Sequence, residues 1–191
     1  MLKDLVLKNR SYRGYDHTYH FTRAELEDYV DHARLCPSSV NKQPLKYYLA
    51  WEEEEVAKIQ AETRWARALQ PTTLPRPGKE PTAFIVICQD DQIDPSLTRY
   101  MKDVGIVAQT MLLAAVEAGQ GGCMIGNFTA EAVRQVLSLP ENLHPLLIVA
   151  FGKPDENIVL VDVQNGETNY YRDAEDTHYV PKRSLQDELI N

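Results

Sequence analysis

The chain has 191 residues, of which 43% are hydrophobic, a length that suits one domain with a buried core but not two full-sized domains. We therefore expect a single domain over residues 1–191. The formal net charge of -8 is the opposite of the basic footprint that nucleic acids and anionic membranes attract, so neither is expected as a partner.

The sequence also argues against export and against a disulfide or zinc framework. No apolar stretch approaches the roughly 20 residues of a transmembrane helix, and residues 1–16 carry charge throughout rather than a long apolar signal core. The three cysteines, Cys36, Cys88 and Cys123, are odd in number and widely spaced. We expect a soluble, cytoplasmic protein.

The first part of the chain alternates helical and extended patterns. Residues 2–9 have the apolar spacing of a short helix. A capping-box pattern at Thr22 and Glu25 begins a second helix, which ends before Pro37. Residues 46–51 form the first expected strand, and the acidic run after it begins a third helix because negative charge suits a helix N-terminus.

The middle of the chain predicts a loop, a buried strand and a central helix. Four prolines interrupt residues 70–81, which indicates a loop or lid. Residues 82–88 are a mostly apolar run typical of a buried strand. Apolar residues at helical spacing from Val104 to Ala115 predict a helix that stops at Gly119 and is buried against the sheet or a second subunit.

The last part predicts one further helix and one strong strand. Residues 123–128 form a short strand or turn, Thr129 caps an amphipathic helix, and residues 144–152 form the last core strand. From residue 158 onward the chain is mostly polar and shows no core pattern. Because helices and strands are mixed without strict βαβ alternation, we predict the α+β class.

Two basic clusters are candidate anion sites. Arg10, Ser11 and Arg13 follow the first helix, and guanidinium forks match phosphate oxygens in bidentate fashion. Lys182 and Arg183 form the second cluster, near the C-terminus. Taken alone, each is more often a solvated turn or tail.

Two other stretches could contact a flat ring. The stretch 37–44, PSSVNKQP, is filled with hydroxyls and amides, and Asn and Gln side chains can read the edge of a heterocycle. The glycine-rich stretch 119–127 is not a dinucleotide fingerprint, since it follows a helix and has Met124 where a glycine is required. Its bare backbone would still let a flat ligand approach closely. Ordinary turns account equally well for each stretch alone.

In this order and spacing the four segments resemble the nitroreductase family of FMN enzymes. RSYRGYD resembles the family's Arg-Ser-x-Arg signature, and ARLCPSSVNKQPLKYYL resembles its Ala-x-x-x-Pro-Ser-x-x-Asn-x-Gln-Pro segment. The long apolar helix with its glycine turn, LIVAFGKP and KRSLQDEL resemble the central helix, the last core strand and the C-terminal basic element. The match covers most of the chain and is weakest over residues 64–81.

The resemblance implies a mixed β-sheet flanked by helices and an intertwined homodimer with FMN at the subunit interface. The basic residues would grip the phosphate and ribityl chain, the Pro-Ser segment would reach the flavin from the partner subunit, and the glycine turn would pack beside the isoalloxazine. The implied cofactor-binding residues are Arg10, Ser11, Arg13, Pro37, Ser38, Ser39, Asn41, Gln43, Met124, Ile125, Gly126, Lys182 and Arg183.

The resemblance also implies ping-pong transfer of electrons from NADH or NADPH, through FMN, to a small acceptor such as a nitroaromatic or quinone. Because a flavin supplies the electronic chemistry, no side chain is expected to be catalytic. The five histidines are not grouped as metal ligands. Two alternatives remain open on the same fold, a flavin-binding sensor or carrier without turnover and a different flavin chemistry such as dehalogenation or flavin fragmentation.

Three local features qualify these expectations. Asn9 stands where many family members have a basic residue, and Leu45 stands where common relatives have an aromatic residue. The proline-rich stretch 70–81 is expected to line the substrate entrance, where Trp65, Arg67 and Arg76, beside or within it, could stack on or neutralise an acceptor. A plain surface loop accounts for this stretch equally well.

Overall fold

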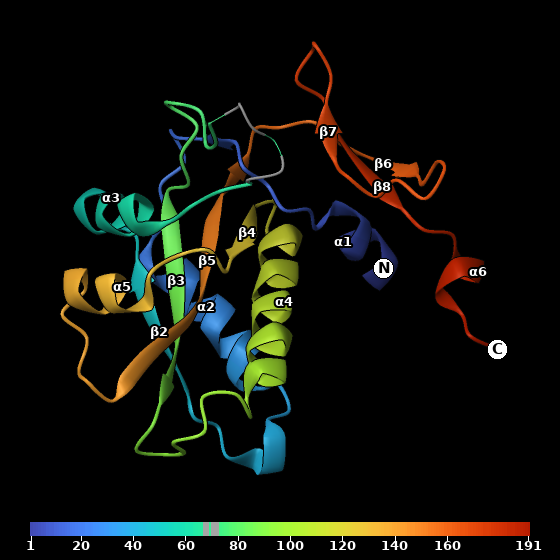
Figure 1. Cartoon of the computed structure of the whole chain (residues 1–191). Helices are drawn as coiled ribbons and strands as arrows, with labels where there is room; N and C mark the ends of the chain where they lie inside the picture. The colour runs from blue at the N-terminus through green and yellow to red at the C-terminus, as the bar shows by residue number, and fades with distance from the viewer. Residues whose placement is uncertain (67–68, 70–72) are drawn as a thin grey trace.

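The computed structural model describes residues 1–66, 69 and 73–191, so Arg67 and Pro71 of the expected entrance loop lie outside the described residues. A five-stranded sheet in the order β1-β5-β3-β2, with β4 also paired to β5, forms the centre of the molecule (Figure 1). Every pair in this sheet is antiparallel. Its strands are β1 (Tyr15–Asp16), β2 (Leu45–Ala50), β3 (Ala83–Asp90), β4 (Gly121–Ile125) and β5 (Leu143–Pro154).

Helices cover both faces of this sheet. Helices α2 and α4 pack on one face, and α3 and α5 pack on the other (Figure 1). Strand β3 supplies both cores, since Ile85 and Ile87 face α4 whereas Phe84 and Val86 face α3. Burial on both faces explains why residues 82–88 are apolar without alternation. The helices are α1 (Leu2–Lys8), α2 (Arg23–Arg34), α3 (Glu53–Glu62), α4 (Met101–Glu117), α5 (Ala130–Val136) and α6 (Leu185–Glu188).

The helix signals of the sequence are confirmed at two ends. Thr22 caps α2 through its hydroxyl, and the Glu25 carboxylate accepts from the Thr22 backbone N–H at 2.8 Å. Helix α4 ends at Glu117 with Ala118 as its C-cap, and the next residue, Gly119, takes the left-handed φ of +82° that glycine tolerates best. No helix in the described residues is long and apolar enough to cross a membrane.

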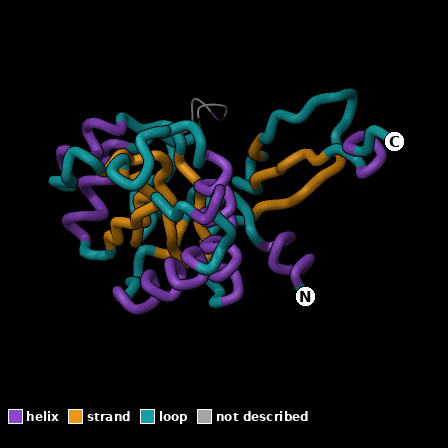
Figure 2. The backbone as a smooth tube through the Cα atoms, turned by 90° about the horizontal axis from the view of Figure 1, so that it is seen from below, coloured by secondary structure: helices purple, strands orange, loops and turns teal. Residues whose placement is uncertain are grey.

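The C-terminal tail is more regular than the sequence analysis expects. Strands β6 (Ile158–Asp162), β7 (Tyr171–Arg172) and β8 (His178–Lys182) form a second sheet in the order β6-β8-β7, in which β6 runs parallel to β8. Figure 2 shows this sheet, with α1 beside it, extending to one side of the main body. No hydrophobic residue in the described range 158–191 is buried, in keeping with the absence of a core pattern. The three strands themselves were not predicted, and the apolar run at the start of β6 is the signal that was overlooked.

Candidate functional site

The first basic segment is fixed against strand β4. Ser11 forms a parallel bridge with Gly122, and the Tyr12 backbone N–H donates to the Gly122 carbonyl at 3.1 Å. The Tyr12 ring lies so close to Gly121 that a Cβ there would be 2.7 Å from the ring. These contacts place Arg10 and Arg13, which flank this stretch, beside the start of β4.

A cavity of about 240 Å³, here called the cationic cavity, opens between this segment and the tail sheet. The Arg10, Arg13 and Lys182 side chains each line it, and among the described residues that line it none is acidic. A site with three cations and a hydroxyl has the chemistry that a phosphate group requires. The lining residues are Asn9, Arg10, Ser11, Arg13, Ile158, Tyr170, His178, Val180 and Lys182.

Arg10 has unused hydrogen-bonding capacity in this cavity. Its Nη2 donates to the Val6 carbonyl at 2.7 Å, but its buried Nε has no partner among the described residues. Burial lowers the pKa of Arg10, while the guanidinium stays charged at neutral pH. A partly desolvated cation with a free N–H gains most from an anionic ligand.

A second cavity of about 260 Å³, here called the β4 cavity, adjoins the first. Arg13 and Tyr170 line both cavities, with the Arg13 guanidinium carbon 5.2 Å from the centre of the Tyr170 ring. Burial raises the pKa of the Cys123 thiol, so this cysteine is a neutral wall residue. The lining residues are Arg13, Arg64, Trp65, Ala66, Cys123, Met124, Ile125, Gly126, Asn127 and Tyr170.

The glycines of the β4 region have different roles. A Cβ at Gly122 would overlap the Ala150 carbonyl oxygen, and Gly121 has no space beside Tyr12. By contrast, a Cβ at Gly126 would meet nothing within 4 Å. Gly121 and Gly122 thus serve close packing inside the chain, and only Gly126 leaves backbone open toward the β4 cavity.

Residues 37–44, here called the Pro-Ser loop, lie beside the first turn of α4, away from β4. The buried Asp103 carboxylate, in the first turn of α4, accepts from the Ser38 hydroxyl at 2.7 Å and from the Ser39 backbone N–H at 2.9 Å. The Ser39 hydroxyl donates to the same carboxylate at 3.1 Å. Both hydroxyls are therefore engaged within the chain, and Asp103 is a loop-fixing residue that the sequence analysis did not identify.

The tip of the Pro-Ser loop is strained and exposed. Val40, Asn41 and Gln43 have φ values of 48°, 53° and 53°, a left-handed conformation that is unfavourable for a β-branched residue such as Val40. Val40 is 84% exposed, and the Gln43 amide donates to Asn41 Oδ1 at 3.1 Å. Strain of this kind is commonly retained where a loop has a binding role.

Within a single chain, the Pro-Ser loop lies apart from the two cavities. The loop is attached to the first turn of α4, whereas β4 follows the last turn of this 17-residue helix. A helix of that length spans about 25 Å at 1.5 Å per residue. In Figure 1 the first turn of α4 lies near the bottom of the molecule, and its last turn lies at mid-height beside β4. Pro37, Ser38 and Gln43 line a separate cavity of about 160 Å³.

The structure thus places the predicted residues in two groups. Lys182 joins the arginine segment, while Arg183 follows β8 as an exposed residue that does not line the cationic cavity. Met124, Ile125 and Gly126 join the same group through the β4 cavity. Tyr170 and His178 also line the cationic cavity but were not predicted from the sequence. They lie in the polar tail, where no apolar pattern or motif marked them as site residues.

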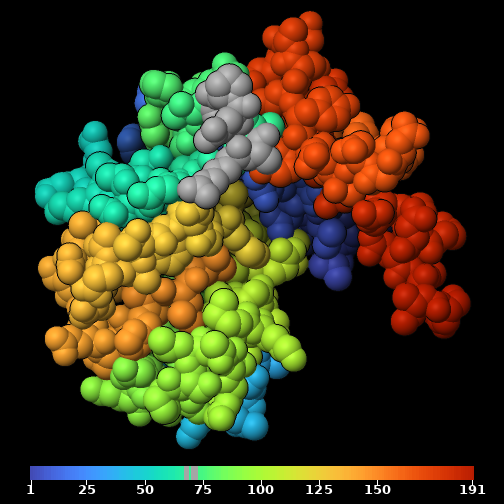
Figure 3. All heavy atoms as spheres, viewed as in Figure 1, coloured from blue at the N-terminus to red at the C-terminus, as the bar shows by residue number. Residues whose placement is uncertain are grey.

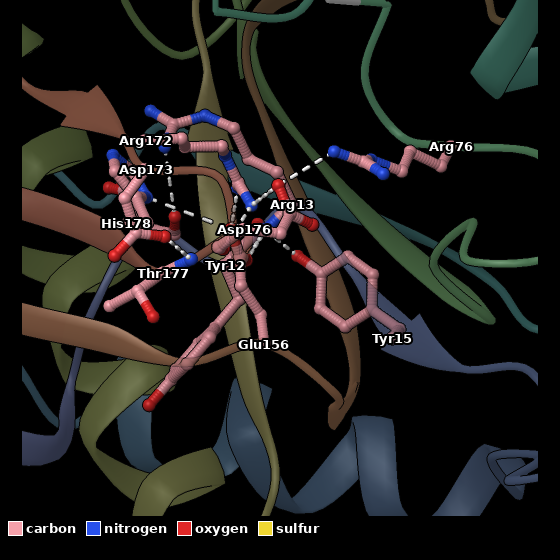
Figure 4. A network of polar contacts seen from close by, with 11 residues as sticks. Tyr12, Arg13, Tyr15, Arg76, Glu156, Arg172, Asp173, Asp176, Thr177 and His178 are labelled. Atoms are coloured by element: carbon pink, nitrogen blue, oxygen red, sulfur yellow. Dashed lines mark hydrogen bonds and ion pairs between the residues drawn. The ribbon is translucent and has the colours of Figure 1, made fainter.

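A buried ion pair supports the wall between the tail and the arginine segment. Glu156 accepts from the Arg13 backbone N–H at 2.6 Å and pairs with Arg172 (Figure 4). Burial would raise the pKa of Glu156, but the His178 ring, the Arg13 N–H and Arg172 outweigh it and lower that pKa. Glu156 is therefore a carboxylate at neutral pH, and it holds Arg13 in place through the backbone.

Comparison with known proteins agrees with this architecture. A protein of Methanothermobacter thermautotrophicus, provisionally named an NADH dehydrogenase/NAD(P)H nitroreductase, is 26% identical over 138 residues, which cover 70% of this chain and 68% of that protein. The FMN-dependent nitroreductase of Clostridium difficile R20291 superposes with a TM-score of 0.63 at 20% identity, covering 80% of this chain and 87% of that one.

A nitroreductase family protein of Clostridium novyi NT superposes with a TM-score of 0.65 at 18% identity and covers 98% of both chains, so the likeness in fold extends into the tail. The model of the nitroreductase family matches residues 6–153. Since this match takes in most of the chain, including the arginine segment, the Pro-Ser loop, α4 and β4, the chain belongs to the nitroreductase family.

Proposed function

We propose that the protein is an FMN-dependent oxidoreductase that transfers electrons from NADH or NADPH to a small acceptor such as a nitroaromatic or quinone. The observation that carries this proposal is the junction of a cationic cavity and a second cavity at Arg13 and Tyr170. An anionic tail and a flat ring on one ligand would fill such a pair of cavities. The NAD(P)H in the name of one relative and the FMN in the name of one structural neighbour are in line with it.

The cationic cavity fits the phosphate end of FMN. Arg10, Arg13 and Lys182 would neutralise the phosphate, and the unpartnered Nε–H of Arg10 would gain an acceptor. Ser11 would add a hydroxyl donor. Each charge-assisted bond of this type contributes about 1.5–3 kcal/mol, so the cluster accounts for tight binding without help from the acidic remainder of the chain.

The β4 cavity fits the ring end of the cofactor. The open backbone of Gly126 and the side chains of Met124 and Ile125 would form the surface on which the ring lies. When bound, the flavin supplies the electron-transfer chemistry, and the protein supplies position and charge. Arg64 and Trp65 line the same cavity, where they would orient the nicotinamide or the acceptor.

The proposal includes a homodimer in which the Pro-Ser loop of one chain completes the cavities of the other. Within one chain the loop lies at the first turn of α4, a helix about 25 Å long, whereas β4 follows its last turn. Figure 3 shows an open notch between the yellow-green atoms of α4 and the red C-terminal segment, and part of another chain would occupy it. Met101 and Ile106 on α4 and Leu185 and Leu189 near the C-terminus are exposed apolar residues, which a partner subunit would cover.

Anaerobic stopped-flow reduction tests this function. The purified protein should carry FMN, and either NADH or NADPH should bleach its yellow colour in a single fast phase. Adding a quinone or nitroaromatic should then restore the colour. A yellow protein that neither nucleotide bleaches would instead indicate a flavin carrier, and a protein that binds no flavin would refute the proposal.

A further inference from the structure

His178 is a buried residue at the wall of the cationic cavity, and its ring has no hydrogen-bond partner. The side chain is 2% exposed, and neither ring nitrogen has a partner among the described residues. Its Nδ1 lies 3.6 Å from Glu156 Oε1, too far for a hydrogen bond. Buried polar groups in folded proteins are rarely left unpaired, so this ring calls for a partner from outside the chain.

The surroundings of His178 fix the direction of its other nitrogen. Glu156 lies on the Nδ1 side, and the Tyr170 ring packs edge-on against the imidazole with centroids 5.3 Å apart. Because the two ring nitrogens lie on different edges of the imidazole, Nε2 is turned away from Glu156. His178 and Tyr170 both line the cationic cavity, so the imidazole borders the space that Arg10 and Lys182 also line.

The charge balance around the ring favours an anion in the cavity. Glu156 is the acidic group that faces the imidazole, and it is already paired with Arg172. Arg10, Arg13 and Lys182 then leave the cavity positive, which matches the charge of about -1.5 to -2 on a phosphate monoester. A phosphate in the cavity would offer the hydrogen-bond acceptor that the Nε2 edge of the ring lacks among the described residues.

We propose that His178 donates its Nε2–H to the phosphate monoester of FMN and thereby selects FMN over riboflavin. This inference rests on the FMN function proposed above. It assigns a binding role to a residue of the tail sheet, outside residues 6–153 that match the family model. Tyr170 holds the imidazole at the cavity wall through their edge-on contact.

Titration of the apo-protein with FMN and with riboflavin tests this role. His178→Phe keeps the ring and its packing on Tyr170 but lacks the donor, whereas His178→Gln keeps an N–H donor. We expect His178→Phe to weaken FMN binding about tenfold or more while riboflavin binding stays constant. His178→Gln should recover part of the FMN affinity.

Two results would overturn the inference. Equal losses for FMN and riboflavin in His178→Phe would mean that the residue only supports the fold, and unchanged FMN affinity would remove it from the site. Failure of the proposed function gives a different result, because the wild-type protein would then bind neither flavin.

Discussion

The change Glu156→Gln removes one buried charge while it keeps the shape of the side chain. Glu156 is 3% exposed and Arg172 is 10% exposed, so their ion pair is shielded from water. Removing one partner of a buried pair costs about 3–5 kcal/mol, because the other charge stays buried. Arg172 retains Asp176 Oδ1 at 3.1 Å, so we expect a loss near the lower end, about 3 kcal/mol.

Thermal unfolding measures this loss. The apo-protein is used, and the chain concentration is kept constant, because flavin binding and dimerisation both shift the apparent stability. For a chain of this size 1 kcal/mol changes Tm by about 2–4 °C, so the variant should melt about 6–12 °C lower. Asp176→Asn is the matched control: Asp176 pairs with the same Arg172 but is itself 41% exposed, and a carboxylate open to water contributes only about 0–1 kcal/mol. Equal shifts for the two variants would refute the argument from burial.

The stability difference between the wild type and Glu156→Gln should depend on pH. The pKa of Glu156 is below its ordinary value of 4.5 in the folded protein, since its polar neighbours outweigh burial. Its stabilisation is therefore fully present above the unfolded pKa and is lost as the pH falls through the lowered folded pKa. The Tm difference between wild type and Glu156→Gln should be constant near neutrality and narrow in acid. A difference that widens in acid would contradict this sign.

Further predictions concern α4, β4 and the cysteines. Gly122→Ala would force a Cβ against the Ala150 carbonyl oxygen and should destabilise the protein by about 1–3 kcal/mol. Urea unfolding measures this loss, and an unchanged unfolding midpoint would contradict the close packing. Asp103→Ala releases the Pro-Ser loop, so proteolysis within the loop should quicken and FMN affinity should fall; an intact loop would show that other contacts hold it. Burial raises the pKa of Cys88 to about 12 and also that of Cys123, so iodoacetamide should label them only after unfolding, and rapid native labelling would contradict their burial.

Local signals predicted the elements that local physics controls. The capping box at Thr22 and Glu25 lies within one helical turn, and the apolar spacing from Val104 to Ala115 depends on helix period alone. The same reasoning selected Arg10 and the residues near it as a candidate anion site, and the structure brings them to one cavity with Lys182.

The roles that the sequence did not reveal depend on contacts between residues distant in sequence. His178 is buried only because the tail sheet brings it against Glu156 and Tyr170, and the polar tail gave no sign of this. The role of Gly122 depends on the neighbouring strand β5. A Cβ at this position would overlap the Ala150 carbonyl oxygen, so the glycine allows close packing of the strands rather than the approach of a ligand.

Mixed dimers test most directly whether two chains share each flavin site. Arg13→Ala and Asn41→Ala would be made in separate chains carrying different affinity tags, co-expressed, and purified over both tags. Each variant alone should bind FMN weakly, since Arg13 lines both cavities and Asn41 lies on the loop proposed to cross from the partner. The mixed dimer should regain one intact site and bind about one FMN tightly per two chains. A mixed dimer as weak as its parents would contradict the shared site.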